Sequence, residues 1–184
     1  DAPDEMAELL DLMKARYDRA AELAAASPAE CIMIPENLSS EVVGLNYYLA
    51  YLRPVESRWI RQIRQAGKYT FIHMDGTLGG LIQEVAKTGF DVIEAVTPQP
   101  CGDLSMAEAM NRVSGPTILW GGLPGALFTP ATSDAEFTAH VLAMLDLMRQ
   151  EPRFVLGVAD QVPPDGLLER VKAVAGLCDR YGRY

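Results

Sequence analysis

The sequence predicts an α/β fold of the (β/α)8 TIM-barrel type, of which the chain holds only about the last five βα units. Short apolar runs alternate with amphipathic segments at helical spacing along the whole chain. This alternation is typical of parallel strands joined by right-handed helical crossovers. Polar or glycine-rich residues follow the runs, and barrel enzymes carry their chemistry at those carboxyl ends of the strands.

An open doubly wound sheet is the alternative architecture. It would place a glycine-rich phosphate loop after the first strand, and residues 34–40 contain no glycine. A complete barrel typically takes about 250 residues and eight strands, whereas this chain has 184 residues. We therefore expect a single domain, residues 1–184, that forms the C-terminal portion of a TIM barrel.

The first predicted elements are a helix, a strand and two further helices. Apolar residues recur at helical spacing over residues 4–26, and acidic residues gather in the first turn, where the helix dipole favours them. A short apolar run of strand type follows over 31–34. Helical segments are then predicted over 40–51 and 55–66, and Pro54 suits the first turn of the second because its ring holds φ near the helical value.

Two βα units are predicted next. The stretch 69–76 is an apolar run that ends in polar residues and glycine, and a helix over 78–88 follows it. Residues 91–97 have the same strand character, and 98–103 form a short proline-rich loop. The sequence Ser105-Met-Ala-Glu108 is a capping-box pattern, so a helix is expected to begin there.

The last predicted elements repeat this order. A strand over 117–121 leads into a glycine-rich turn over 121–125. A second capping box opens an amphipathic helix over 133–149. A strand over 153–159 and a helix over 165–181 complete the five units.

Composition excludes several classes of partner. The net charge is -9 with only 16 Lys and Arg, so there is no electrostatic footprint for nucleic acid or an anionic membrane. No stretch reaches the roughly 20 apolar residues of a membrane helix.

The N-terminus begins with Asp1 and Asp4 in place of a basic signal region, and its lack of methionine suggests that a preceding segment was removed or left out. Three widely spaced cysteines indicate no disulfide framework, and a cytoplasmic location is expected.

His73 and Asp75 are the first candidates for a functional site. On a strand they share one face, which places an imidazole beside a carboxylate. Such a pair, joined by carboxylates from neighbouring strands, suits a divalent metal. It also suits acid/base chemistry by the histidine. The structural alternative is that Asp75 caps the next helix while His73 bonds a backbone carbonyl.

Glu94 and Asp160 are the further candidates. Glu94 lies inside an apolar strand, where an unpaired carboxylate is costly to bury, so it needs a partner or water. In one register it faces His73 from the adjacent strand, and in the other it faces solvent or a helix. Asp160 ends the last strand, and its alternative role is to cap the final helix, for which Asp165 is better placed.

Other conspicuous residues are expected to be structural. Trp120, Gly121 and Gly122 suit the wall and floor of a site. Three tyrosines at helical spacing suit packing rather than a ligand cage, namely Tyr47, Tyr48 and Tyr51.

The order of motifs resembles the C-terminal part of the uroporphyrinogen decarboxylase superfamily, from about residue 5 to the end. The segments that carry the resemblance are 35–40, 47–54, 72–76, 87–91, 119–124 and 156–164. The resemblance implies a (β/α)8 barrel. It also implies one of two activities, porphyrinogen decarboxylation or zinc-dependent methyl transfer between a corrinoid protein and a thiol or another acceptor.

The chain departs from both branches of that superfamily. Its methyltransferases have His-x-Cys on the strand and a further cysteine in the last loop, whereas this chain has His73-Met-Asp75 and the run 157–160. Its decarboxylases have a histidine in that last loop, and here there is none. Carboxylates therefore stand where the resemblance would place thiolates.

From these residues we expect a metal-dependent methyltransferase whose metal ligands are His73, Glu94 and Asp160. Asp75 would be a fourth ligand or support, and His73, Asp75 and Glu94 would be the catalytic residues. Zinc is the metal expected first, and the resemblance implies a small-molecule substrate and a corrinoid protein as partner. The alternatives are a metal-free decarboxylase or lyase that uses His73 as acid/base, and a non-catalytic binding protein.

A homodimer is also expected. Five parallel strands leave a sheet edge with unpaired backbone groups, and such an edge tends to pair with another chain.

Overall fold

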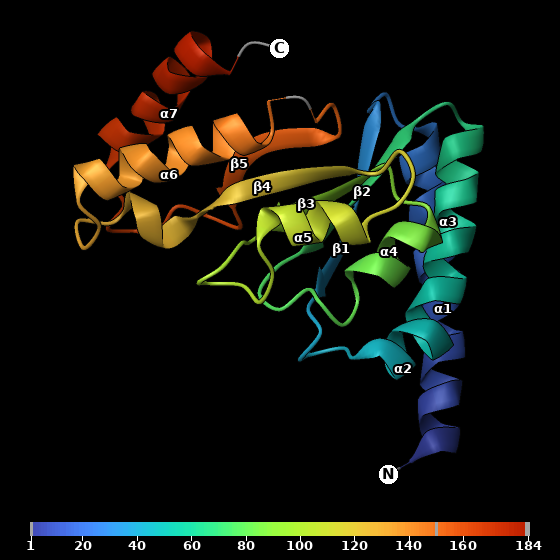
Figure 1. Cartoon of the computed structure of the whole chain (residues 1–184). Coiled ribbons are helices and arrows are strands. Elements are labelled where there is room, and N and C mark those ends of the chain that lie inside the picture. Colours follow the sequence, from blue (N-terminus) through green and yellow to red (C-terminus); the bar gives the residue numbers. More distant parts are fainter. Residues whose placement is uncertain (1, 150, 183–184) are drawn as a thin grey trace.

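The computed structural model describes residues 2–149 and 151–182, and its centre is one five-stranded sheet (Figure 1). The strands are paired in the order β1-β2-β3-β4-β5, and every pair is parallel. They span Cys31–Leu38, Tyr69–Met74, Val92–Val96, Ile118–Pro124 and Phe154–Ala159. The predicted α/β class with five βα units is confirmed as part of a TIM barrel, which does not close within the described residues. Asp1, part of the acidic N-terminus noted above, lies outside them.

Helices precede, connect and follow the strands, and those between the strands cover one face of the sheet (Figure 1). They are α1 Pro3–Ala26, α2 Leu45–Tyr47, the π-helix η1 Tyr48–Leu52, α3 Arg53–Gln65, α4 Ile82–Thr88, α5 Met106–Arg112, the 3-10 helix η2 Gly125–Phe128, α6 Asp134–Leu147 and α7 Leu168–Tyr181. Both capping boxes form, because Ser105 and Ser133 each accept a bond from the backbone of the glutamate three residues on. The two predicted capping boxes are therefore confirmed.

Strand β1 is longer than the predicted 31–34. A register shift between Ile34 and Asn37 absorbs Pro35, and pairing with β2 then resumes at Asn37 and Leu38. A proline cannot donate a ladder hydrogen bond, so a bulge is where a strand tolerates it.

The predicted turn over 121–125 is wrong, because β4 continues to Pro124. Gly122, Leu123 and Pro124 pair with successive residues of β5. Glycine and proline favour turns locally, but the ladder to a neighbouring strand overrides that preference. The chain leaves the sheet only at η2.

Three helices begin later than predicted, because the residues expected to form their first turns lie in loops and make hydrogen bonds there. The segment from 40 becomes helical only at Leu45, after Gly44 with φ of 68°. Before α4, the Asp103 carboxylate accepts the amides of Leu78 and Gly79. Before α7, the amide of Leu167 donates to Phe128 O. Asp165 therefore caps no helix, since the residue before α7 is Leu167.

The two faces of the sheet differ in what covers them. Side chains directed at the helices, such as Ile72, Ile93 and Leu119, are fully buried. Alternate residues point to the opposite face, where Tyr69 and Trp120 are exposed. His73 lies on this open face, two residues after Phe71. The polar residues at the strand ends are therefore reached from the open face of the sheet.

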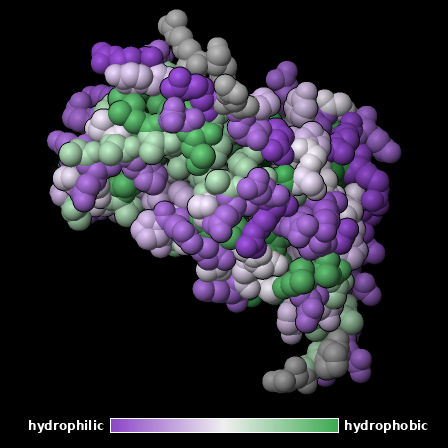
Figure 2. Space-filling model, viewed as in Figure 1, coloured by the Kyte–Doolittle hydropathy of each residue, from purple (hydrophilic) through white to green (hydrophobic). Residues whose placement is uncertain are grey.

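The first half of α1 projects from the body (Figures 1 and 2). Its residues from Asp4 to Tyr17 are exposed, and packing on α3 begins at Tyr17, whose ring centroid lies 6.2 Å from that of Trp59. Hydrophobic side chains are among the exposed ones, including Leu9 and Leu12. Within the described residues, no helix is long and apolar enough to span a membrane.

Gly121→Ala is expected to destabilise the protein by about 1–3 kcal/mol. Gly121 has φ of 154°, and a Cβ there would lie well inside van der Waals contact with the backbone of Val96. Two paired strands cannot separate locally without losing ladder bonds, so the strain stays. Gly176→Ala in α7 is the control, since its Cβ would meet nothing and alanine favours a helix. Thermal unfolding should show a lower Tm for the first variant and not for the second.

Candidate functional site

The polar residues expected at the strand ends come together at one edge of the sheet. His73 is near the end of β2 and pairs laterally with Glu94 of β3. Asp75 follows β2 directly, and Asp160 follows β5 directly. Parallel strands present their carboxyl ends on the same side, so the ends of β2, β3 and β5 supply one cluster.

Glu94 holds the imidazole of His73. Its Oε2 lies 2.7 Å from Nδ1, and the two side chains are only 17% and 16% exposed. A carboxylate can only accept, so Nδ1 carries the hydrogen of this bond. The contact fixes the ring and directs Nε2 away from Glu94.

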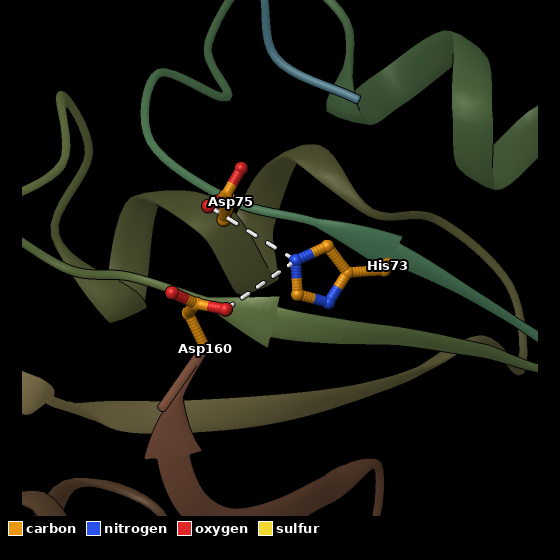
Figure 3. Close-up of side chains that lie close together, drawn as sticks. All are labelled: His73, Asp75 and Asp160. Atoms are coloured by element: carbon orange, nitrogen blue, oxygen red, sulfur yellow. Dashed lines mark ion pairs between the residues drawn. The ribbon is translucent and has the colours of Figure 1, made fainter. Parts of the chain in front are cut away.

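Nε2 of His73 points towards two further carboxylates (Figure 3). Asp160 Oδ1 lies 3.7 Å and Asp75 Oδ2 lies 4.0 Å from Nε2. These distances are too long for hydrogen bonds. The three residues can each offer one ligand atom, and these atoms lie within 4.8 Å of one another. One nitrogen and two oxygens around a common space form a donor set suited to a divalent cation.

The structure places Glu94 differently from the other expected ligands. Glu94 faces His73 from the adjacent strand, as expected for one of the two possible strand registers. It is not one of the three residues whose donor atoms lie grouped together, which are His73, Asp75 and Asp160. A metal-binding histidine commonly donates its other ring N–H to a carboxylate, which sets the tautomer and the ring orientation. Glu94 has the position of that supporting carboxylate, while Asp75 has the position of a ligand.

The structural alternatives for the two aspartates are wrong. The residue before α4 is Leu81, and no side chain caps that helix, so Asp75 does not serve as its cap. No side chain caps α7 either, and Asp160 lies well before it. Neither carboxylate is used by a helix end, so both are free to face His73.

The backbone is strained at two positions that orient side chains of the candidate site. Ala95, next to Glu94, has φ of 68°, and Asp160 has φ of 67°. Non-glycine residues rarely adopt this conformation, and where they do the surrounding structure enforces it, often at functional sites. The pairing of β3 with β4 also shifts between Ile93 and Val96. The sequence offers no signal for this strain, apart from the tolerance of aspartate for positive φ.

An aromatic pair lies on the same sheet face as His73. The rings of Phe71 and Trp120 are 6.4 Å apart and tilted by 41°. Trp120 was expected to form a wall, and its ring is partly exposed on the open face. Phe71 was overlooked, although its position two residues before His73 on the same strand could have revealed it.

Comparison with known proteins gives a family and a fold. The family model for uroporphyrinogen decarboxylase (URO-D) matches residues 1–181. Among solved structures, a methyltransferase from Methanosarcina mazei superposes with a TM-score of 0.68 at 16% sequence identity. The match covers 89% of this chain and 47% of that one, so the chain spans about half the length of its structural neighbour. No curated protein sequence matches the chain.

Proposed function

Because the chain belongs to the uroporphyrinogen decarboxylase family, we propose that it is a metal-dependent methyltransferase of that family, acting on a small substrate or a corrinoid-bound methyl group. The family and the methyltransferase neighbour support an enzyme. The observation that supports a metal site is the grouping of His73, Asp75 and Asp160, whose potential ligand atoms lie within 4.8 Å of one another.

The three residues fit a divalent cation, with zinc the first expectation. Nε2 of His73 has no hydrogen-bond partner within the described residues, and two carboxylate oxygens face it at 3.7 and 4.0 Å. Three protein ligands leave a position open for a substrate atom, as in catalytic zinc sites. A bound metal would act there as a Lewis acid towards the heteroatom of the methyl acceptor or leaving group.

The remaining residues of the site orient and shape it. Glu94 accepts the Nδ1 hydrogen of His73, so Nε2 presents its lone pair towards the aspartates. The aspartates balance cationic charge at a position that is open to solvent, since Asp160 is the most exposed member of the group. Phe71 and Trp120 offer an apolar surface on the same face for the body of a substrate.

Metal content is the direct test. Purified protein loaded with zinc and dialysed should retain about one ion per chain by elemental analysis, and His73→Ala should retain almost none, because the one nitrogen ligand is gone. His140→Ala is the matched control, since His140 is the other histidine and its Nε2 contacts Gly122 O instead of the site. Metal retention that is equal in wild type and His73→Ala would remove the proposal.

A metal-free decarboxylase or lyase is the second candidate, and the short contact between His73 and Glu94 favours it. An imidazole held at 2.7 Å by a carboxylate is arranged to take up or release a proton at Nε2. The two candidates differ in their response to chelators. A metal-dependent transferase loses turnover in the presence of a chelator, whereas a lyase of this kind keeps it.

The proposal implies a small-molecule substrate and a corrinoid protein as methyl donor or acceptor. It also implies a cytoplasmic location, where such partners and reduced cysteines are maintained. Cys31, Cys101 and Cys178 are free thiols, which is consistent with that setting.

A further inference from the structure

A buried polar cluster lies on the helix side of the sheet, away from the candidate site. It consists of Glu56 on α3, Tyr48 on η1 and Thr88 at the end of α4. Glu56 and Tyr48 are both 0% exposed. The Tyr48 hydroxyl lies 2.8 Å from Glu56 Oε2 and 2.7 Å from Thr88 Oγ1, and Thr88 Oγ1 lies 2.9 Å from the Glu84 carbonyl. Three helical elements thus meet in a single chain of oxygen atoms.

Counting hydrogens distinguishes two forms of this chain. If Glu56 is ionised, Tyr48 donates to it, and the one hydrogen of Thr88 must serve either Tyr48 or the Glu84 carbonyl. If Glu56 is protonated, it donates to Tyr48, Tyr48 donates to Thr88, and Thr88 donates to that carbonyl. Only the protonated form makes all three bonds.

The charges around Glu56 also favour the neutral form. Glu56 Oε1 is buried without a hydrogen-bond partner. Arg53 is a cation near Tyr48, but it pairs with Glu84 at 3.0 Å, while Glu36 on β1 adds a negative charge near Glu56. Burial, helped by Glu36 and opposed by the Tyr48 hydrogen bond, raises the pKa of Glu56 to about 7. Burial also raises the pKa of Glu36.

We propose that Glu56 is a proton-dependent latch that ties η1 to α3 and α4 while it is neutral and releases η1 when it loses its proton. The π-helical turn is suited to this role, because such turns are rare, less regular than an α-helix and frequent at functional positions. The latch is argued from the contacts of Tyr48, Glu56 and Thr88 and does not rest on the proposed methyl transfer.

The latched segment continues into the loop that borders the candidate site. Residues 39–44 lead from β1 into α2, and Ser40 N donates to Thr77 O at 2.7 Å. Ser40 Oγ accepts from Gly80 N at 2.9 Å. Thr77 and Gly80 belong to the loop that begins at Asp75. Release of η1 therefore loosens the support of the loop that carries one of the proposed ligands.

The test is hydrogen exchange followed by mass spectrometry from pH 5 to 7.5, corrected for the intrinsic exchange rate. A carboxyl whose pKa is raised in the closed state binds its proton more tightly there. The closed state is therefore favoured most below the ordinary pKa of glutamate, and the advantage is lost as the pH rises to about 7. Opening of peptides covering residues 45–56 and 82–88 should increase roughly 40-fold between pH 5 and 7.

Glu56→Gln should abolish that dependence, because its amide donates to Tyr48 at every pH. Glu41→Gln, at an exposed carboxyl near the same segment, should keep it. Carboxyl titration of the unaltered protein by NMR requires no variant. One glutamate should titrate near 7, and the amides of Tyr48 and Thr88 should follow with the same midpoint. Two results would overturn the latch. One is corrected exchange in these peptides that does not depend on pH in the wild type, and the other is exchange that depends on pH equally in Glu56→Gln.

Discussion

Replacing Arg170 with methionine is expected to lower the free energy of unfolding by about 3 kcal/mol. Arg170 is 6% exposed, and its side chain reaches from α7 to the segment that follows β4. Its Nη1 donates to the carbonyls of Leu127 and Thr129, both at 2.7 Å, and its Nη2 donates to Thr132 O. Its guanidinium also lies 5.3 Å from the ring centroid of Phe137.

The loss comes mainly from the carbonyls. Methionine fills similar volume but donates nothing, so three acceptors in the loop lose a charged donor at once. The ion pair with Asp134 adds little, because that carboxylate is 91% exposed. The effect on stability is therefore much larger than a surface ion pair would suggest.

Denaturant unfolding of Arg170→Met measures the loss directly. Lys172→Met on the same helix is the control. Within the described part of the chain, Lys172 makes only an exposed ion pair with Glu169, so its replacement should change stability by less than about 0.5 kcal/mol. Arg170→Lys should give an intermediate loss, because an ammonium cannot reach all of these acceptors. Equal losses in the methionine variants at 170 and 172 would refute the role given to Arg170.

Glu94→Gln is expected to weaken metal binding by about 10- to 100-fold, the usual cost of altering a carboxylate that supports a metal-bound histidine. The amide oxygen can still accept from Nδ1 of His73, so the ring stays in place. It carries no charge, so Nε2 becomes a poorer donor to the metal. The fold should be little affected, since the one hydrogen bond that the Glu94 side chain makes within the described residues is to this ring.

Competition with a chelating dye gives the zinc affinity of each variant. Glu41→Gln removes the same charge from an exposed position and should bind as wild type does. Asp160→Asn removes a proposed ligand, and its loss should be at least as large as that of Glu94→Gln. If Glu94→Gln binds zinc as tightly as wild type, Glu94 is not the support of His73 that its position implies.

Much of the fold could be predicted because its signals are local. The capping boxes at Ser105 and Ser133 depend on residues three positions apart, and both form as expected. The five apolar runs identify the strands, because parallel strands are typically near-continuous runs of apolar residues. The ends of β1 and β4 could not be predicted, since they depend on pairing with β2 and β5.

In the candidate site, too, local features could be predicted from the sequence and contacts between strands could not. Alternation along a strand places His73 and Asp75 on one face, and their position at a strand end marks them as candidates without any structure. The roles within the cluster are different. Glu94 contacts Nδ1, whereas Asp160 faces Nε2, and this follows from strand register and from two residues with positive φ.

The sequence by itself determined which residues could act, because residue type and spacing along one strand are local properties. Only the tertiary structure decided what each does. Glu94 meets His73 from a strand 21 positions away, and Tyr48 meets Thr88 from 40 positions away. Such contacts exist only once separate strands and helices have packed together, and they turn one carboxylate into a support for a histidine and another, Glu56, into a buried acid.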